Sequence, residues 1–172
     1  MITAVDTNIL LDILIPESKF CLESKQLLDN ATQKGLIVIN EVVYAELSSQ
    51  FESQQDLDCF LGDTGIRLIP TGKKALYLAG EMWKVYSARK KKGFQCPKCG
   101  GFQEILCKEC GSRISNRQHI ISDFIIGAHA LLQSNVFITR DRGFYKDYFK
   151  DLVIKTSAKS LKKTNQPSES AT

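Results

Sequence analysis

The sequence predicts an α/β fold in which a central parallel sheet lies between two layers of helices. Short apolar runs rich in β-branched residues, such as LIVI and VFIT, recur along the chain and are typical of buried strands. Longer stretches with apolar residues at helical spacing separate them, and this alternation indicates a sheet with helices on both faces. A chain of 172 residues, 43% of them hydrophobic, suits one core of ordinary size.

Strands and helices alternate through the first part of the chain. ITAV is the first expected strand, and the apolar stretch ILLDILI that follows Asp6 is the first expected helix. Gly35 suits the C-terminal end of a helix, and Asn40 suits an N-cap. In chain order, the next expected elements are a helix at 18–34, a strand at 36–39, helices at 40–51 and 54–61, and a strand at 66–69.

The second part of the chain repeats this alternation around a break. The longest expected helix spans about 71–92 and has apolar residues at i, i+3 and i+4 spacing. Ser122 is expected to cap the helix that follows the break. The remaining expected elements are a strand at 136–139, a short amphipathic helix at 143–149 and a strand at 152–155. We expect one domain made of 1–93 and 119–156, an inserted segment at 94–118 and a disordered tail at 157–172.

Four acidic residues occupy positions where a parallel sheet brings side chains together. Asp6 follows the first strand and Asp141 follows the strand at 136–139, so both are expected at the same carboxyl edge. Asp123 lies at the start of a helix, and Glu46 reaches in from another helix with a longer side chain. Carboxylates that meet at one point repel one another without a cation, and Mg²⁺ and Mn²⁺ prefer such oxygen ligands. The pattern therefore predicts a metal-dependent phosphoryl-transfer site.

Each acidic residue taken alone also has an ordinary structural interpretation. Asp123 suits the first turn of a helix, where the helix dipole favours negative charge, and Asp141 suits a turn. The metal-site hypothesis depends on all four residues meeting. Asp12, further along the helix that follows Asp6, is interpreted as a surface residue.

Two CxxC pairs interrupt the second part of the chain. They are Cys96 with Cys99 and Cys107 with Cys110, and a glycine follows the second cysteine of each pair. In a chain with no evident export signal, this spacing favours a structural four-sulfur Zn²⁺ site over disulfides or a redox dithiol, which are the alternatives. A segment of about 25 residues cannot build a hydrophobic core, so zinc would supply most of its folding free energy.

Positive charge is concentrated around the cysteine pairs. Residues 1–81 carry 6 Lys/Arg against 12 Asp/Glu, whereas residues 82–118 carry 9 against 2. A basic segment beside an acidic body indicates a polyanionic partner that is met at one place. The candidate residues for contact with such a partner, which the resemblance described below implies to be RNA, are Arg89, Lys90, Lys91, Lys92, Lys98, Arg113 and Arg117. The alternative is that the run at 89–92 only complements the negative end of a helix.

The motifs VDTNILLD, YAEL, SDFIIGAHA and FITRDRGF, in this order, resemble those of PIN-domain nucleases, most of all the VapC-like toxin ribonucleases. The resemblance covers about 1–93 and 119–155. It implies a PIN-like three-layer sandwich and a hydrolase that uses Mg²⁺ or Mn²⁺ to activate water against RNA phosphodiesters. The metal ligands that it implies are Asp6, Glu46, Asp123 and Asp141. It also places Asn8 and Thr139 where they would orient these ligands.

The sequence therefore favours a metal-dependent endoribonuclease, either a VapC-like toxin or an RNA-processing nuclease whose zinc ribbon helps to select a structured RNA. By the same resemblance, a toxin would have an antitoxin that covers the acidic site, and would form a homodimer. The alternative is a non-catalytic RNA- or protein-binding module that retains the fold. No apolar run reaches the length of a membrane span, and the first residues lack the basic region of a signal peptide. We therefore expect a cytoplasmic protein.

Overall fold

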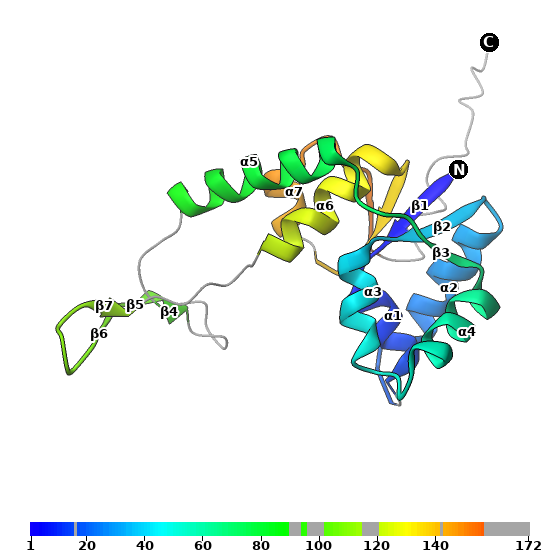
Figure 1. The fold of residues 1–172 in the computed structure, drawn as a ribbon, viewed down its shortest axis with the longest axis horizontal. Coiled ribbons are helices and arrows are strands. Elements are labelled where there is room, and N and C mark those ends of the chain that lie inside the picture. The colour runs from blue at the N-terminus through cyan, green and yellow to red at the C-terminus, as the bar shows by residue number, and fades with distance from the viewer. Residues whose placement is uncertain (16, 90–93, 96–101, 115–120, 142, 157–172) are drawn as a thin grey trace, which may run out of the picture.

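A five-stranded parallel sheet forms the centre of the molecule (Figure 1). The computed structural model describes residues 1–15, 17–89, 94–95, 102–114, 121–141 and 143–156. The strands are β1 (Ile2–Val5), β2 (Leu36–Ile39), β3 (Ile66–Leu68), β8 (Val136–Ile138) and β9 (Ile154–Lys155). Their order is β3-β2-β1-β8-β9, and every neighbouring pair is parallel. The parallel α/β fold expected from the sequence is confirmed.

Helices cover both faces of this sheet (Figure 1). The helices on one side are α1 (Thr7–Leu14), α2 (Cys21–Thr32), α3 (Glu41–Ser48) and α4 (Gln54–Thr64). Those on the other side are α5 (Lys73–Arg89), α6 (Ile121–Gln133) and α7 (Phe144–Tyr148). Right-handed crossovers explain this division, because the chain moves outward first to β3 and later, in the opposite direction, to β9.

The core fills the space between the sheet and the helices. All of β8 is buried, as are three of the four residues of β2, which is typical of a parallel sheet covered on both faces. Phe124 of α6 is fully buried. Its ring packs edge-on against Phe144 of α7 and against Trp83 of α5, with centroids 4.8 and 5.6 Å apart. These aromatic contacts join α5, α6 and α7 into one layer.

Several helix ends differ from the sequence expectation. α2 begins at Cys21 rather than at residue 18. Ser122 does not cap α6, because this helix already begins at Ile121 and the buried Ser122 hydroxyl makes no hydrogen bond in the described part of the chain. Asn40 does cap α3, and its Oδ1 accepts a hydrogen bond from the Val43 N–H at 3.0 Å. A capping residue read from the sequence is therefore a cap only where the helix begins at the next residue, as it does after Asn40 and not after Ser122.

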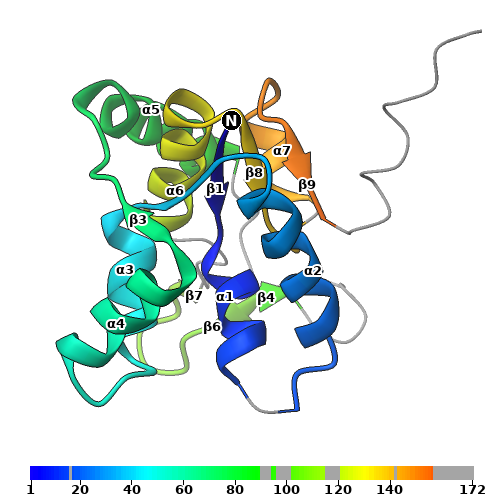
Figure 2. The same ribbon diagram turned by 90° about the vertical axis from the view of Figure 1, so that its right-hand side faces the viewer.

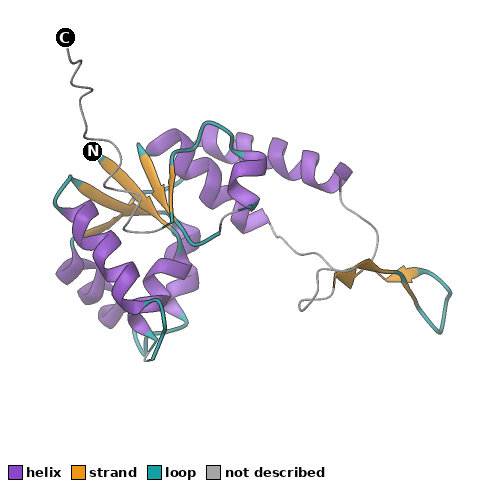
Figure 3. Cartoon of the chain, turned by 180° about the vertical axis from the view of Figure 1, so that it is seen from behind, coloured by secondary structure: helices purple, strands orange, loops and turns teal. Residues whose placement is uncertain are grey.

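The cysteine segment lies between α5 and α6. Its described part contains two short antiparallel pairs: β4 (Phe94–Gln95) with β5 (Phe102–Gln103), and β6 (Ile105–Leu106) with β7 (Arg113–Ile114). These pairs lie beyond the C-terminal end of α5, away from the sheet (Figure 1, Figure 3). The division into a nuclease domain, a zinc ribbon and a tail stays a prediction, and the tail at 157–172 lies outside the described residues.

The order in which strands are added to the sheet reverses between β1 and β8, because β2 and β3 lie on one side of β1 and β8 and β9 on the other. β2 pairs with one side of β1 and β8 with the other, and Val5 stands opposite Ile138. The Asp6 N–H continues this ladder by donating to the Ile138 carbonyl at 2.9 Å. α1 follows β1 at this edge, with α2 and α3 beside it (Figure 2). Open α/β sheets bind ligands at such switch points, so the side chains just after β1 and β8 are candidate site residues.

Candidate active site

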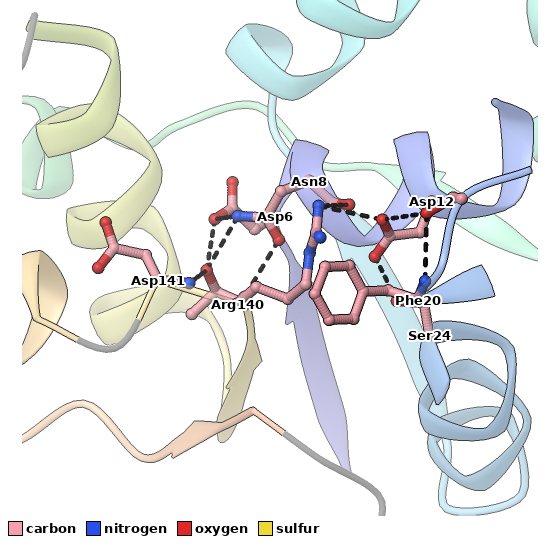
Figure 4. Close-up of polar contacts among 9 residues, drawn as sticks. Asp6, Asn8, Asp12, Phe20, Ser24, Arg140 and Asp141 are labelled. Atoms are coloured by element: carbon pink, nitrogen blue, oxygen red, sulfur yellow. Dashed lines mark hydrogen bonds and ion pairs between the residues drawn. The ribbon is translucent and has the colours of Figure 1, made fainter. Parts of the chain in front are cut away.

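Asp6 is the buried acidic residue at this switch point, with 6% of its surface exposed. Its Oδ2 accepts hydrogen bonds from the Thr139 hydroxyl at 2.5 Å and from the Asn8 amide at 2.6 Å. The Asn8 amide also donates to Thr139 Oγ1 at 3.2 Å, and Figure 4 shows Asn8 beside Asp6. Residues that follow β1 and β8 therefore form one hydrogen-bonded cluster around the Asp6 carboxylate.

The Asp6 carboxylate carries its charge at a cost. Burial, partly opposed by the hydrogen bond from Thr139, raises the pKa of Asp6 from 3.8 to about 6. The carboxylates of Glu46 and Asp123 contribute to the rise. A cation near Asp6 would lower this cost, so the electrostatics of the site favours one.

Asp141 stands at the end of β8, next to the Asp6 cluster. Its backbone N–H donates to Thr139 Oγ1 at 3.0 Å. Its Oδ1 accepts hydrogen bonds from the N–H groups of Gly143 and Phe144 at 2.9 and 3.0 Å, and so caps the start of α7. The structural interpretation of Asp141 therefore holds for one of its two oxygens, while Oδ2 takes no part in these bonds.

Glu46 and Asp123 approach the site from two helices. Glu46 of α3 is exposed and accepts a hydrogen bond from the hydroxyl of Thr7, the first residue of α1. Asp123 lies half-buried in the first turn of α6. Exposure therefore increases from Asp6 through Asp123 to Glu46, and the site opens to solvent on the side of Glu46.

Tyr145 shows that the four carboxylates share one neighbourhood. This tyrosine of α7 is buried, and burial raises the pKa of its hydroxyl well above the usual range. The carboxylates of Asp6, Asp123, Asp141 and Glu46 all contribute to this rise. The fold therefore brings together the four acidic residues that lie far apart in the sequence.

The four carboxylates are neighbours, but they do not converge as metal ligands. Among the residues that the structure describes, no group of three or more His, Cys, Asp or Glu side chains is arranged to hold a metal ion. Hydrogen bonds explain why these side chains do not point to one centre. Glu46 is bonded to Thr7, and one oxygen of Asp141 is bonded to the start of α7. Carboxylate oxygens are nevertheless the donor type that Mg²⁺ and Mn²⁺ take. Metal ligation by the four residues stays a prediction.

Asp12 is not a surface residue, contrary to the sequence expectation. Only 4% of it is exposed, and its Oδ1 pairs with Arg140 Nη2 at 3.0 Å (Figure 4). The hydroxyls of Ser18 and Ser24 donate to its two oxygens at 2.9 and 2.6 Å. The only signal in the sequence was the position of this acidic residue inside the apolar run ILLDILI, because a charge that is buried among apolar residues needs a partner.

Arg140, which the sequence did not single out, connects this ion pair with the Asp6 cluster. Its guanidinium donates to the Asn8 backbone carbonyl at 3.1 Å and lies 4.5 Å from the centroid of the Phe20 ring. Its backbone N–H donates to Asn8 Oδ1 at 3.1 Å. The motif directed attention to the neighbours Thr139 and Asp141 instead.

The second cysteine pair lies in a tight turn between β6 and β7. The Gly111 N–H donates to the Cys107 carbonyl at 2.9 Å, and Gly111 has a φ of 71°, which glycine adopts readily. Hydrogen bonding with Ser112, and then with Cys107, lowers the pKa of the Cys110 thiol. The two thiols of this pair are therefore close together, as a zinc knuckle requires.

Other predicted site residues fall in the least described part of the chain. Arg89 is exposed at the end of α5, and Arg113 belongs to β7. The predicted residues that lie outside the described residues are Cys96, Cys99, Lys90, Lys91, Lys92, Lys98 and Arg117. The zinc site and the RNA contacts therefore stay predictions.

Solved structures of VapBC2, FitAcB and the toxin VapC20 share the fold of this chain. It is similar to a VapBC2 complex of Rickettsia felis bound to a promoter DNA fragment, with a TM-score of 0.56, 18% identity and coverage of 90% of this chain and 98% of that one. For FitAcB from Neisseria gonorrhoeae the TM-score is 0.57 and the identity 16%, over 91% of this chain and 97% of that one. For VapC20 from Mycobacterium tuberculosis, a toxin that cleaves the sarcin-ricin loop, the TM-score is 0.51 and the identity 13%, over 88% of this chain and 98% of that one.

At these identities the likeness concerns the fold. The expected PIN-like sandwich is confirmed as the architecture of the chain. No protein-family model matches the sequence, and no curated protein matches it. Among the described helices, none is long and apolar enough to cross a membrane.

Proposed function

We propose that this chain is an endoribonuclease that depends on Mg²⁺ or Mn²⁺. The observation that carries the proposal is the buried Asp6 carboxylate at the switch point of the sheet, whose pKa is raised by burial and by neighbouring acids. Three further carboxylates stand near it, those of Glu46, Asp123 and Asp141. Such a cluster supports hydrolysis by an activated water, because carboxylates hold the cations that phosphodiester cleavage uses.

The described hydrogen bonds give the carboxylates different tasks. When bound, a divalent ion would offset charge on the phosphodiester and lower the pKa of a water molecule. Asp6 is the fixed ligand, because Thr139 and Asn8 hold one of its oxygens. Asp141 offers Oδ2, since its Oδ1 caps α7. Glu46 is exposed, so its longer side chain is the one that adjusts as RNA enters.

Cleavage of a pool of structured RNAs tests this proposal. We expect cleavage with Mn²⁺ or Mg²⁺, its loss in EDTA, and a fall of more than about 100-fold in Asp123→Asn, because a ligand counts for more than its supporting groups. Asp29→Asn, which alters an exposed carboxylate on α2, is the matched control. Cleavage that persists unchanged in Asp123→Asn would come from a contaminating nuclease and would remove the proposal.

The similar solved structures support a toxin role over RNA processing. One is VapC20, a toxin that cleaves the sarcin-ricin loop, and others are VapBC2, FitAcB and FitAB, two of them bound to DNA. We propose that an antitoxin protein covers the acidic site and that the toxin acts on a structured RNA. Expression that stops growth, relieved by a neighbouring small gene, supports this role. Harmless expression together with defective RNA processing in a deletion strain would favour the processing nuclease.

One observation favours the non-catalytic alternative, a binding module that retains the fold. The described carboxylates are held by hydroxyl and backbone donors and do not converge as ligands. Calorimetric titration with Mn²⁺ separates the two functions. Binding that is lost in Asp6→Asn supports the nuclease, whereas RNA binding without Mn²⁺ binding or cleavage supports the module.

We further propose a structural Zn²⁺ held by both cysteine pairs, with RNA contacts from the basic residues around it. The turn that brings Cys107 and Cys110 together supports half of this site. Zinc would then hold the basic residues around the cysteine pairs together beyond the end of α5, as a small surface that we call the basic platform. The platform adds phosphate contacts and so helps to select the RNA.

A further inference from the structure

We propose that Asp12 and Arg140 form a positioning device that fixes Asn8, and through Asn8 the Asp6 carboxylate, for binding a divalent cation. The inference rests on the proposed function, because it concerns the same site. It assigns a role to the buried ion pair that the four-carboxylate scheme leaves without one. The contacts that carry it run from α2 through α1 to the end of β8 (Figure 4).

Asp12 is the fixed end of the device. It is 4% exposed, and Arg140 and Ser18 bind its Oδ1 while Ser24 binds its Oδ2. A buried carboxylate with this many donors has one well-defined orientation. Because these donors come from α2, the loop before it and the end of β8, Asp12 ties three segments to the middle of α1.

The Arg140 guanidinium transfers this fixed position to Asn8, and the Arg140 backbone adds a second contact. Its guanidinium Nη2 donates to the Asn8 backbone carbonyl, and its backbone N–H donates to Asn8 Oδ1, each at 3.1 Å. The Phe20 ring lies against the guanidinium, with its centroid 4.5 Å away, and limits its movement. Arg140 therefore restrains both the backbone and the side chain of Asn8.

Asn8 in turn restrains the carboxylate of Asp6, the candidate metal ligand. With Oδ1 facing the Arg140 N–H, the amide must present Nδ2 to Asp6 and Thr139, where it makes bonds of 2.6 and 3.2 Å. A rotated amide would place its NH₂ group against the Arg140 N–H, two donors facing each other. The device thus sets which atom of the Asn8 amide faces Asp6, and holds the Asp6 carboxylate beside Thr139 at the end of β8.

Mn²⁺ binding to the metal-free protein, measured by calorimetry or electron paramagnetic resonance, tests the inference. We expect Arg140→Met to weaken Mn²⁺ binding about 10- to 100-fold, the range for groups that orient metal ligands. Arg140→Lys retains the positive charge but loses the several N–H donors of the guanidinium, so Mn²⁺ affinity should fall less than in Arg140→Met. Asp12→Asn should match Arg140→Met, and the double variant should lose no more than either single one, since both act through one pair.

A structural control separates positioning from stability. Thr71→Val removes another buried hydroxyl, which lies just before α5 and donates to Glu41, the first residue of α3. This variant should have a lower melting temperature and an unchanged Mn²⁺ affinity. If Arg140→Met binds Mn²⁺ as tightly as the wild type, the inference is wrong while the proposed function stands. If the wild type itself binds no Mn²⁺ and cleaves no RNA, the proposed function fails and takes the inference with it.

RNA cleavage kinetics test the competing role for Arg140, which is direct contact with a phosphate. The side chain of Arg140 is 33% exposed, so this contact is sterically open to it. A positioning role predicts that Arg140→Met lowers kcat and leaves KM within about two-fold at saturating Mn²⁺, because the ligands and not the substrate are displaced. A raised KM with unchanged kcat and Mn²⁺ affinity would overturn the inference.

Discussion

The Asp6 carboxyl is buried at the end of β1, where the charge that metal binding requires works against folding. Its pKa is raised from 3.8 to about 6, mainly by burial. Between these two pH values the folded protein binds more protons at this site than the unfolded chain does. Metal-free stability should therefore fall as the pH rises through this window, and the full cost should be present above pH 6.

Asp6→Asn should accordingly stabilise the metal-free protein at pH 7 by about 1–3 kcal/mol, since each pKa unit corresponds to about 1.4 kcal/mol. The amide oxygen can still accept the hydrogen bond from Thr139. Urea unfolding in EDTA at pH 4 and pH 7 measures the effect, and the gain should vanish at the lower pH. Asp29→Asn, at an exposed carboxylate, should change little at either pH. A destabilised Asp6→Asn at pH 7 would contradict this account.

At this scale the sequence predicted the residues that stand at strand ends and missed those defined by tertiary burial. Asp6 and Thr139 were recognisable because each follows an apolar strand within a motif. The partnership of Asp12 with Arg140 joins residues 128 positions apart, and no local periodicity reports such a pair. Asp12 was misplaced because helix spacing alone does not say which face is covered by the next helix.

Helix α6 carries Asp123 in its first turn and passes directly over β1 and β8. Gly127, one turn after Asp123, makes close packing possible: a Cβ there would lie 2.7 Å from Phe149 Cδ2. Phe149 is 2% exposed, so its ring has no space to move into. The missing side chain at Gly127 thus sets how near the helix lies to the core.

Gly127→Ala should therefore destabilise the protein by about 1–3 kcal/mol, as overpacking of a filled core does. Gly80→Ala is the matched control, because Gly80 lies exposed in α5 and a Cβ there meets nothing within 4 Å. That change should stabilise by about 0.5–1 kcal/mol through helix propensity. Thermal melts of the two variants measure the expected loss of stability in Gly127→Ala and the expected gain in Gly80→Ala. Equal effects would show that packing at Gly127 does not position α6.

Element types were predictable because their causes are local, whereas some element ends depend on neighbours. The β-branched run LIVI became β2 with the expected bounds. α6, by contrast, begins before Ser122, so the expected cap became a half-buried residue inside the helix whose hydroxyl is buried. Close packing such as that at Gly127 is also invisible in the sequence, because it depends on where Phe149 lies in space.

The whole molecule combines an acidic body with a basic insertion. Carboxylates from the ends of β1 and β8 and from α3 and α6 lie near the switch point, so the topology brings together residues that are far apart in the sequence. Positive charge falls mainly on residues 82–118, with 9 Lys/Arg against 2 Asp/Glu. Within the proposed function, the body performs the chemistry and the insertion supplies phosphate contacts. These two tasks should be separable by mutation.

Cys107→Ser tests this separation. If the cysteine pairs hold one structural Zn²⁺, the variant should lose bound zinc and bind an uncleaved RNA at least about 10-fold more weakly, because an unfolded platform no longer presents its basic side chains together. Its Mn²⁺ affinity should stay unchanged, since the carboxylates belong to the sheet and its helices. The RNA measurement uses Asp123→Asn as the background, which prevents cleavage.

Cys59→Ser is the matched control, because Cys59 is an exposed cysteine on α4 that belongs to neither pair. It should retain zinc, RNA affinity and Mn²⁺ affinity. Atomic absorption after dialysis gives the zinc content, and a salt titration of RNA binding shows how many fewer phosphates the variant neutralises. Zinc that persists in Cys107→Ser would rule out the four-sulfur site. A loss of Mn²⁺ binding in that variant would show that the insertion and the carboxylates depend on each other.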